Sequence, residues 1–523
     1  MQSVAAAFTA EERDVVRTVA QSTKLSWKKS YLSSQRFMTI GISTIGSNDI
    51  IPGPASTTSA WNRYQYADET DYVMDIAIDK ELNLPLGGLV KAMADFSLDN
   101  TSGRFTPRYV GGNSELFTAL LPRRPVIITQ GFKVNGVDQT VPEFVGVTTR
   151  TPEVSLLNKT AQLHAEDFIG FLQNKFLDRQ VMFTAQRTDQ VMETLLQSIG
   201  YGTAQYDLDA GINTIPFGLF EVGTKLADIF DQLAKAELGH FFQDEEGKLK
   251  FWNRQHWDSS PYTEVQRVIS TSQVLDAKVP KDDHIINVVE VTSKVRNKKP
   301  EKIIFKSVSG GDNMSLAPSS VTEKFINFQD PALSMTTPTG TSTSSYFKVN
   351  TAADGSGTDI TSSVTITRVD KFATSAKLFF NNANAATGYI TELTVTGRTA
   401  EYDKTIYVRE KRGISVTAYE EQVFAYENDY IQDETWAGSL ANLVIQDFGL
   451  PENIQDITIR AIPELQLGDL ISWQGRQWRI YSIKSRMSAT AGFVQDLKLV
   501  QRASHTYFRI GISTIGGTDG IAA

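Results

Sequence analysis

The sequence predicts a β-rich α+β multidomain protein with two small β-barrel-like domains, an inserted α+β domain, an inserted β-sandwich and extended terminal arms. Its 523 residues correspond to about three to five domains at the usual size of about 100–200 residues each. Segments with strand-like alternation recur near both ends, whereas the period of amphipathic helices appears in a central section and one later segment. With 41% apolar and 21% charged residues, the composition is that of a globular protein.

Charge and cysteine content narrow the functional classes. Lys and Arg number 51 and Asp and Glu 60, which gives a net charge of −9 and disfavours a protein that holds nucleic acid by its phosphates. The chain has no cysteine, which excludes disulfide scaffolds, thiolate zinc sites and cysteine nucleophiles. No run approaches the roughly 20 apolar residues of a membrane helix, and the first residues do not resemble a signal peptide. We expect no stable membrane insertion.

Residues 1–60 are predicted to form an N-terminal arm, and residues 504–523 a C-terminal arm. Thr9 and Glu12 have capping-box spacing, which predicts a short helix from about residue 10. The apolar segment 37–51 contains IGISTIG, and the C-terminal arm repeats these seven residues unchanged.

The repeated segments are the candidate interaction site. We expect them to form strands that either pair within one protomer or dock on a neighbouring subunit or ring. Their apolar residues are Ile40, Ile42, Ile45, Ile510, Ile512 and Ile515.

The first β-domain is predicted at 61–160. Val90, Ala92, Ala94, Phe96 and Leu98 alternate with residues that are mostly polar, which is the pattern of a half-buried strand. A turn at 100–103 follows, and further strands are predicted at 126–129, 132–134 and 144–147.

Between residues 161 and 265 the spacing of apolar residues changes to that of amphipathic helices, which predicts the α+β domain. Thr188 and Thr224 are predicted to cap two helices that stop at Gly200 and Gly239. Each helix has one apolar face, formed by Val191, Leu195, Leu196 and Ile199 in the first and by Leu226, Ile229, Phe230 and Leu233 in the second. A hairpin is predicted over 241–252, with a turn of Asp, Glu and Gly at its tip.

The second β-domain is predicted at 266–308 plus 400–503, interrupted by an insertion at 309–399. Residues 310–365 are rich in Ser, Thr and Gly, which predicts mainly loops, and strands resume at 364–395 as part of a sandwich. One helix is expected to begin at Asp433 and Glu434 and to end at Gly449.

Motifs that carry chemistry are weak throughout. The five histidines are widely scattered, and Asp207, Asp209 and Asn213 lack the later glutamate of a calcium loop. Ser43 and Ser513 lie in a spacing one residue too long for a nucleophile elbow. We assign no catalytic, metal or cofactor-binding residue and expect the protein not to be an enzyme.

Other polar and aromatic groups have ordinary structural explanations. Asp244, Glu245 and Glu246 are expected to be solvated at a hairpin tip, and Arg123, Arg124 and Arg150 to lie on a solvated face, although they could also form a basic rim. Five tryptophans could line a sugar groove, but most occupy predicted strand or helix positions and are expected to be core: Trp252, Trp257, Trp436, Trp473 and Trp478.

The order of motifs resembles the baseplate hub, or minor tail proteins, at the tail tip of long, non-contractile-tailed bacteriophages. The resemblance rests on ADFSLDNTSGRFTPRY (94–109), LLPRRPVIITQGF (120–132) and FVGV (144–147), and continues through a helical domain that closes on FFQDEEGKLKFWNR to IPELQLGDLISWQGRQWRIYSI. It covers roughly 65–305 and 400–502. The N-terminal arm, the insertion and the terminal repeat depart from the simplest hubs.

The resemblance implies a structural virion protein at the tail tip, made in the host cytoplasm. In that family two related β-domains per subunit alternate around a homotrimer, so that three chains form a pseudo-hexameric ring that ends the tail tube and opens for DNA ejection. The implied partners are a distal tail protein or tail-tube ring, the tape measure protein, other tail-tip or receptor-binding proteins, and genomic DNA in passage. The alternatives are a carbohydrate-binding adhesin that uses the 309–399 insertion and a cell-wall-degrading tail enzyme.

Overall fold

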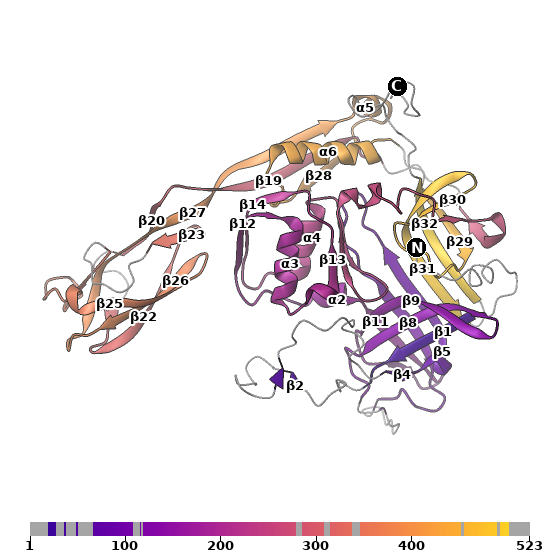
Figure 1. Cartoon of the computed structure of the whole chain (residues 1–523), viewed down its shortest axis with the longest axis horizontal. Helices are drawn as coiled ribbons and strands as arrows, with labels where there is room; N and C mark the ends of the chain where they lie inside the picture. The colour runs from indigo at the N-terminus through magenta and orange to yellow at the C-terminus, as the bar shows by residue number, and fades with distance from the viewer. Residues whose placement is uncertain are drawn as a thin grey trace.

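The computed structural model describes residues 19–27, 36–37, 49–50, 66–107, 116, 119–278, 285–307, 314–336, 346–450, 454–488 and 492–501. The helix expected from about residue 10, both copies of IGISTIG with their six isoleucines, and Ser43 and Ser513 lie outside these residues. Two short strands, β2 (Arg36–Phe37) and β3 (Asp49–Ile50), pair in parallel on either side of the first copy. Figure 1 shows a body of sheets and helices from which a long arm extends.

The body is built on one open sheet of fourteen strands whose path runs β18-β29-β32-β31-β5-β7-β11-β9-β8-β1-β4. Its strands come from both ends of the sequence. They are β1 (Val19–Leu25), β4 (Ala67–Asp68), β5 (Val73–Glu81), β7 (Met93–Asp99), β8 (Pro125–Val134), β9 (Val137–Thr148), β10 (Glu153–Ser155), β11 (Thr160–Glu166), β17 (Arg267–Val268), β18 (Val274–Ala277), β29 (Ile454–Arg460), β30 (Leu470–Trp473), β31 (Arg476–Ser488) and β32 (Gly492–Gln501).

The seam of this sheet is the antiparallel pairing of β5 with β31. Seven residue pairs join them, from Glu81 opposite Ser482 to Asp75 opposite Ser488. Strands that the sequence places in two separate β-domains therefore continue one another edge to edge. The path ends at β18 and β4, so the described strands form an open sheet with no closed barrel.

The alternation predicted for the first β-domain is confirmed. Val90, Ala92, Ala94, Phe96 and Leu98 are all buried, and the last three belong to β7. Ala92, Ala94, Phe96 and Leu98 pack in one core with strands β5, β8 and β11, because side chains two residues apart lie on one face of a strand, whereas Val90 packs in the core of the second β-domain.

The α+β region lies beside this sheet, where Gln243 donates to the Val145 carbonyl of β9 at 2.7 Å. Its helices are α2 (Phe168–Leu172), α3 (Thr188–Ser198) and α4 (Leu226–Lys235). Its strands form a pair, β12 (Val181–Arg187) with β14 (Thr214–Phe220), and a small sheet of β13 (Tyr206–Leu208), β16 (Leu249–Trp252), β15 (His240–Gln243) and β6 (Gly88–Leu89).

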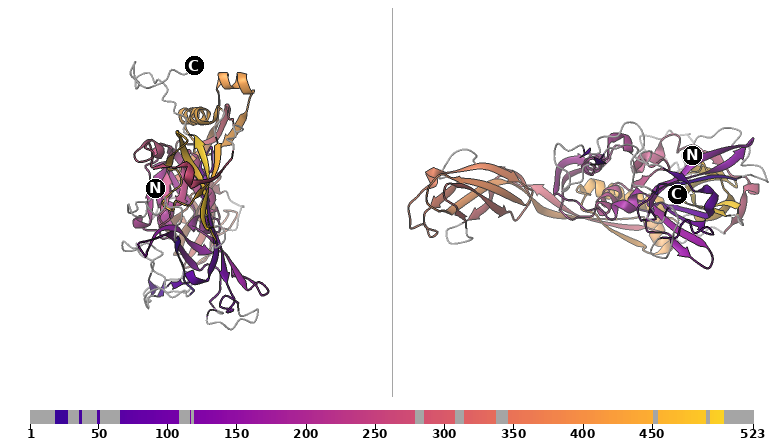
Figure 2. Two further views of the ribbon diagram at one scale, coloured as in Figure 1. Left: turned by 90° about the vertical axis from the view of Figure 1, so that its right-hand side faces the viewer. Right: turned by 90° about the horizontal axis from the view of Figure 1, so that it is seen from below.

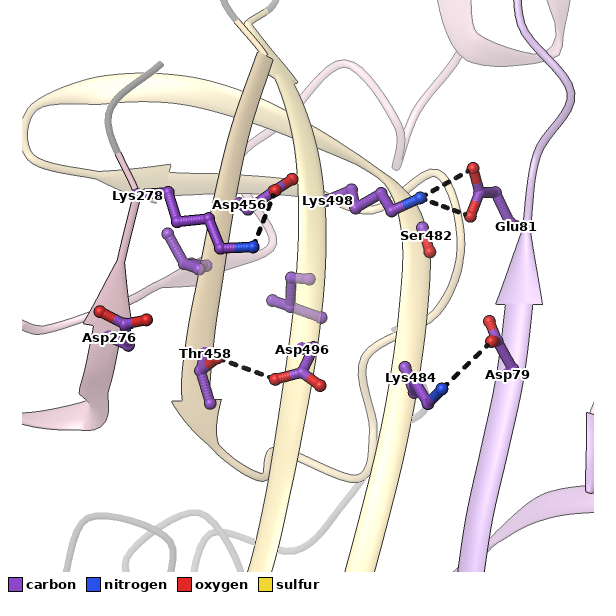
Figure 3. Close-up of a pocket in the computed structure, with 12 residues that line it drawn as sticks. Asp79, Glu81, Asp276, Lys278, Asp456, Thr458, Ser482, Lys484, Asp496 and Lys498 are labelled. Carbon is purple, nitrogen blue, oxygen red and sulfur yellow. Dashed lines mark hydrogen bonds and ion pairs between the residues drawn. The ribbon is translucent and has the colours of Figure 1, made fainter. Parts of the chain in front are cut away.

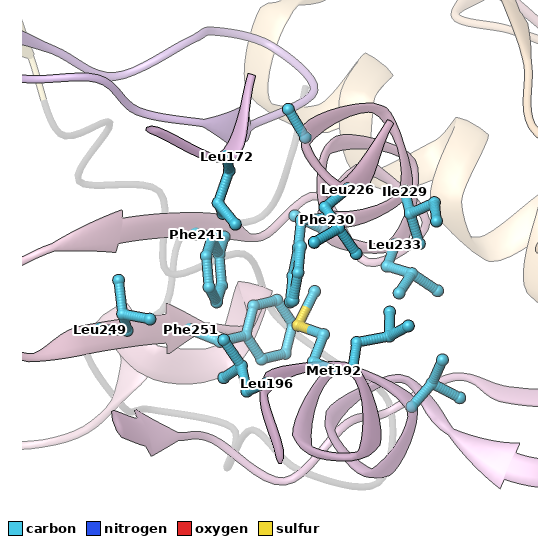
Figure 4. Packing of buried hydrophobic residues seen from close by; sticks show 14 of the residues in the cluster. Leu172, Met192, Leu196, Leu226, Ile229, Phe230, Leu233, Phe241, Leu249 and Phe251 are labelled. Carbon is cyan, nitrogen blue, oxygen red and sulfur yellow. The ribbon is translucent and has the colours of Figure 1, made fainter. Parts of the chain in front are cut away.

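Both predicted helices and the hairpin β15–β16 are confirmed. The N-caps of α3 and α4 are Arg187 and Lys225, so Thr188 lies one residue inside its helix and Thr224 one residue before its N-cap. The apolar faces of the two helices meet the hairpin in a shared core, where the rings of Phe230 and Phe241 stack at 4.5 Å (Figure 4).

Two more sheets, of seven and three strands, run from the body into the long arm that ends in the inserted domain. The first holds β19 (Val288–Lys298), β20 (Lys302–Ser307), β21 (Ser315–Leu316), β23 (Ala332–Thr336), β24 (Phe347–Asn350), β27 (Gly388–Lys411) and β28 (Val423–Glu427). The second holds β22 (Ser320–Asn327), β26 (Ser375–Asn382) and β25 (Val364–Lys371). The two sheets enclose a core of their own around Phe347 and Phe380, which makes the distal part a sandwich.

The described part of 310–365, which is predicted to be mainly loop, is about half strand, because it contains β21 to β24 and the start of β25. Ser and Thr are poor helix formers, but Thr is well accommodated in strands, and the apolar residues between them fill the sandwich core. Ile326, Phe347 and Val349, for example, are almost fully buried.

The strand β27 links the sandwich to the body. Its 24 residues pair with β20, β21, β23 and β24 at the sandwich end and with β19 at the body end. The predicted helix is α6 (Glu434–Phe448), which packs on β19 and β27, and Asp433 caps it by accepting a hydrogen bond from the Trp436 amide. A short helix, α5 (Gly413–Tyr419), follows β27.

The β-rich, multidomain α+β class predicted from the sequence is confirmed. Short 3-10 turns complete the described elements, at Thr70–Tyr72, Thr203–Gln205, Arg254–Asp258, Thr271–Gln273 and Thr361–Ser363. None of the helices in the described residues has the length and hydropathy needed to cross a membrane.

Candidate functional site

The sequence motif at 98–106 builds one tightly bonded turn after β7. The buried Asn100 accepts the Phe105 amide at 2.8 Å through Oδ1 and donates to the Thr106 hydroxyl at 2.9 Å through Nδ2. Arg104 extends to the fully buried Glu69 at 2.8 Å, and Phe105 is itself fully buried. The residues that make this motif recognisable in the sequence therefore have anchoring roles in the first β-domain.

A charged groove lies over the outer face of the seam (Figure 3). Side chains of β5, β18, β29, β31 and β32 enclose a volume of about 400 Å³. Its charged lining consists of Asp79, Glu81, Asp276, Lys278, Asp456, Lys484, Asp496 and Lys498. Five carboxylates against three ammonium groups leave an acidic excess on this surface.

Every lysine of the charged groove has an acidic partner. Lys498 lies 2.8 Å from Glu81, Lys484 3.7 Å from Asp79, and Lys278 3.5 Å from Asp456. The first two pairs bridge β5 to strands from the far end of the chain. Because these lysines are already neutralised, the charged groove offers no free cation to hold a phosphate.

A buried ionic junction lies on the opposite side of the same seam. Since successive side chains of a strand point to opposite faces, Asp79 and Glu81 reach the charged groove while Lys80 points inward. The Lys80 ammonium lies 2.7 Å from Glu245 of the β15–β16 turn and 4.0 Å from Glu143 of β9. Gln466, in the loop before β30, donates to the other oxygen of Glu245 at 2.8 Å.

The ionic junction therefore joins three regions of the chain: the first β-domain, the α+β region and the second β-domain. Two further contacts extend it. Arg267 and the fully buried Glu464 form an ion pair at 3.3 Å. Asp167, which caps α2, accepts the Ala92 amide at 2.8 Å and so links the α+β region to the first β-domain.

Burial and charge set the protonation of these groups. Burial raises the pKa of Glu143 to about 8, with Glu245 and Glu464 adding to the effect and Lys80 opposing it. Burial would also raise the pKa of Glu245, but the adjacent Lys80 ammonium outweighs it and lowers the pKa. Burial raises the pKa of Asp167 to about 7. The ionic junction thus holds Glu245 charged and Glu143 protonated at neutral pH.

The expectation that Asp244 and Glu245 are solvated is wrong. Glu245 lies in the ionic junction with its side chain only 11% exposed, and the Asp244 carboxylate accepts the Glu246 and Lys248 amides within the turn. A hairpin tip is normally exposed, but here it inserts between the two β-domains. Lys80 could have been found from the sequence, because it has the same parity as the buried Ile76 and Ile78. Glu245 gives no such signal.

An aromatic cluster locks the segment after β16 onto the second β-domain. Trp252, His256, Trp257 and Tyr262 lie with ring centroids 4.3–5.7 Å apart. Trp257 covers Gly468, where an added Cβ would lie 1.8 Å from the indole ring. The glycine of the LGD motif is therefore required by this close contact, and its φ of +81° also favours glycine.

The tryptophans have structural positions. Trp473 and Trp478 are buried, as predicted, and Trp252 and Trp257 pack partly buried on the same core. Trp436 is partly buried and donates its indole N–H to the Ala236 carbonyl at 3.0 Å.

The remaining candidate groups do not converge on a site. Asp207 pairs with Lys250 at 2.7 Å, whereas Asp209 contacts His256 at 2.8 Å. Across the described ranges, no group of three or more His, Asp or Glu side chains is placed to hold a metal ion.

The three arginines form no common basic rim. Arg124 is buried and donates to the Ala119 carbonyl at 2.8 Å, which makes the expectation of a solvated face wrong for this residue. Arg123 lies 3.7 Å from Glu166, and Arg150 pairs with Glu153 at 2.5 Å. Each arginine is thus bound to a local partner.

No protein-family model matches the chain, and no curated protein sequence matches it. Several solved structures show limited similarity to the fold of this chain. The 43 kDa tail protein of prophage MuSo2 from Shewanella oneidensis has 10% identity and a TM-score of 0.42, covering 84% of this chain and 95% of its own. The tail protein from Neisseria meningitidis MC58 has 10% identity and a TM-score of 0.42, covering 83% and 93%. Prophage tail protein gp18 from Listeria monocytogenes EGD-e has 9% identity and a TM-score of 0.41, covering 85% and 94%. At these values the similarity assigns no role to any residue of this chain.

Proposed function

We propose that the chain is a structural protein of a phage tail, and that three copies form the hub of the tail tip. The proposal starts from the residues that resemble the hub family, which lie in the first β-domain, the α+β region and the second β-domain. The observation that carries it is the single sheet shared by the two β-domains, with Ser482 to Ser488 of β31 paired along β5. One protomer then supplies two β-domains in a fixed relation, and three protomers supply six positions around a tube.

The ends of this sheet suit closure into a ring. The path ends at β18 on one side and β4 on the other, which leaves two different edges for neighbours. Contacts between different surfaces of identical chains are heterologous, and such contacts close into rings when the rotation permits. In this proposal β18 and the β1–β4 edge face adjacent subunits.

The charge fits a channel through which DNA passes. Each free Lys or Arg that binds a phosphate adds a favourable counterion-release contribution, which would slow the passage of DNA. The net charge is −9, and the lysines of the charged groove are neutralised by carboxylates. In the proposed assembly the hub binds a distal tail protein or tube ring, the tape measure protein and other tip proteins.

The oligomeric state and its place in the virion test the proposal. Mass photometry of the purified chain, or cryo-electron microscopy of the intact tail, should show three copies in one ring at the tip. An antibody against the sandwich should label that end of the tail in electron micrographs. A ring of another order in the assembled tail, or a location away from the tail tip, would refute the hub assignment.

A second role, binding of host-surface carbohydrate by the sandwich, is favoured by one observation. Phe325 and Val321 lie exposed on β22, 54% and 57% respectively, on the outer face of the three-stranded sheet. Nearby, Arg368 lies over the Phe379 ring at 5.0 Å, and Lys377 pairs with Glu323 at 2.8 Å. Ligand sites are commonly lined by apolar and aromatic side chains with a few polar or charged groups among them.

A glycan array tests this role. Binding that disappears in a Phe325→Ser variant, but persists in a variant with Leu157→Ser at the exposed turn after β10, would support it. Equal glycan binding by the two variants would exclude this role for the sandwich.

The proposal gives this chain no catalytic step. Zymography on host cell walls tests that part, since activity abolished by one acidic substitution would establish an enzyme instead.

A further inference from the structure

The sandwich is joined to the rest of the protein by a narrow stalk. Figures 1 and 2 show it standing out from the body at the end of β20 and β27. Along one edge of β27, the pairing with β23 ends at Thr399. Along the far edge of β19, the pairing with β28 ends at Thr292. Within the described residues, the ladder between 294–298 and 401–405 is therefore two strands wide.

This two-stranded stretch, which we call the stalk, contains an irregularity. The register of β19 and β27 shifts between Val295 and Arg296, so that Asp403 is an extra residue on β27. A bulge bends a strand and increases its local twist, and two-stranded ribbons vary most in twist. Asn297 and Lys299 hold the Asp403 carboxylate at 2.7 Å and 2.9 Å on the surface.

A second contact joins the sandwich to the body away from the stalk. Gln180, just before β12, accepts the Ala373 amide at 2.9 Å and donates to the Thr374 hydroxyl at 3.3 Å. Its amide also donates to Glu221 in the body at 2.7 Å, which holds the side chain in place. Ala373 and Thr374 form the turn between β25 and β26, at the sandwich end nearest the α+β region.

The surfaces around this contact are not packed against each other. A cavity of about 210 Å³ lies there, with Met182 on the body side and Met335 and Phe372 on the sandwich side. Phe372 remains 46% exposed. A permanent domain interface is close-packed, whereas here a few polar contacts span a gap.

We propose that the sandwich is a lever that pivots at the stalk, and that Gln180 is the latch that holds it in the position seen here. Release breaks the two hydrogen bonds from Gln180 to the turn at 373–374, while the stalk stays paired and Val295 stays packed in the body core. Two such bonds bias the closed state by about 5- to 150-fold. Release also widens the gap between Met182 and Phe372. The inference concerns the arm alone and does not depend on the proposed function.

Distance measurements between the sandwich and the body test the latch. The chain has no native cysteine, so spin labels can be placed at Thr194→Cys on α3 and Ala353→Cys in an exposed loop of the sandwich. Double electron-electron resonance on the full-length protein should give one narrow distance distribution. Gln180→Ala should broaden it and add a population at a different distance, raising the open-to-closed ratio by about 5- to 150-fold.

Two controls separate release from general damage. Gln186→Ala changes the same residue type on the neighbouring strand β12 and should leave the distribution unchanged. Thr374→Val removes one latch bond from the sandwich side and should have an intermediate effect, which also serves if Gln180→Ala fails to fold. Hydrogen exchange at the Ala373 amide should accelerate in Gln180→Ala and not in Gln186→Ala.

The inference is overturned if the distance distribution of Gln180→Ala matches that of the unsubstituted protein. If Gln180→Ala does not fold, the same comparison with Thr374→Val decides. The inference is equally overturned if the unsubstituted protein already shows the broad distribution.

Discussion

Replacing Lys80 by methionine removes the only positive charge within 4.0 Å of Glu245 or Glu143 among the ion pairs of the described residues. The side chains of Lys80 and Glu245 are 9% and 11% exposed, and their charged atoms lie 2.7 Å apart. Methionine retains the apolar stem but leaves Glu245 with Gln466 as its side-chain partner. Breaking a buried pair in this way costs about 3–5 kcal/mol.

The matched control is Lys484→Met on the other side of the seam. Lys484 and Asp79 lie 3.7 Å apart and are 46% and 41% exposed, so the loss there should be about 0–1 kcal/mol. Urea unfolding followed by tryptophan fluorescence measures both, and hydrogen exchange should show faster opening of β15–β16 in Lys80→Met only. Adding Glu245→Gln should recover part of the loss, because no buried charge then remains unpaired. If Lys80→Met costs no more than Lys484→Met, the ionic junction does not hold the three regions together.

Three further outcomes follow from single residues. Burial raises the pKa of Glu143 from 4.5 in the unfolded chain to about 8 in the native state, so the native state binds the extra proton and the Glu143 contribution to stability should fall as pH rises from about 4.5 to 8. In thermal melts, Glu143→Gln should flatten this fall. His240 has the opposite effect: because burial lowers its pKa from 6.5 to about 4, its contribution to stability rises as pH rises between these two values. Gly468→Ala should displace Trp257 and cost more than about 2 kcal/mol, visible as a change in near-UV circular dichroism, and an unchanged spectrum would contradict the contact. Asp433→Ala should cost about 1 kcal/mol by removing the cap of α6, and the cost should vanish with Asp433→Ser.

Local features of the fold could be predicted because they depend on neighbouring residues. The alternation from Val90 to Leu98 specifies a half-buried strand, and the spacing of Leu226, Ile229, Phe230 and Leu233 specifies one buried helix face. Both patterns reflect the geometry of a single element. The structure agrees with each, apart from the identity of two N-caps.

The features that could not be predicted involve residues far apart in the sequence. Ser485 pairs with Ile78, and Glu245 meets Lys80, at separations that no local pattern encodes. The three acids at 244–246 look like any solvated turn until the turn is inserted between two sheets. The strands between Ser315 and Asn350 could not be predicted for another reason: their Ser- and Thr-rich composition also occurs in loops, and only the sandwich core shows which residues are buried.

The ion pairs on the two faces of the seam differ in their exposure to solvent, so dissolved salt acts on them differently. On the outer face, Glu81 and Lys498 are both 45% exposed, so dissolved salt screens their attraction. On the inner face, Lys80 and Glu245 are shielded from solvent, and salt changes their interaction little. Raising the ionic strength should therefore weaken the Glu81–Lys498 pair, while the Lys80–Glu245 pair and the backbone pairing of β5 with β31 hold the seam together.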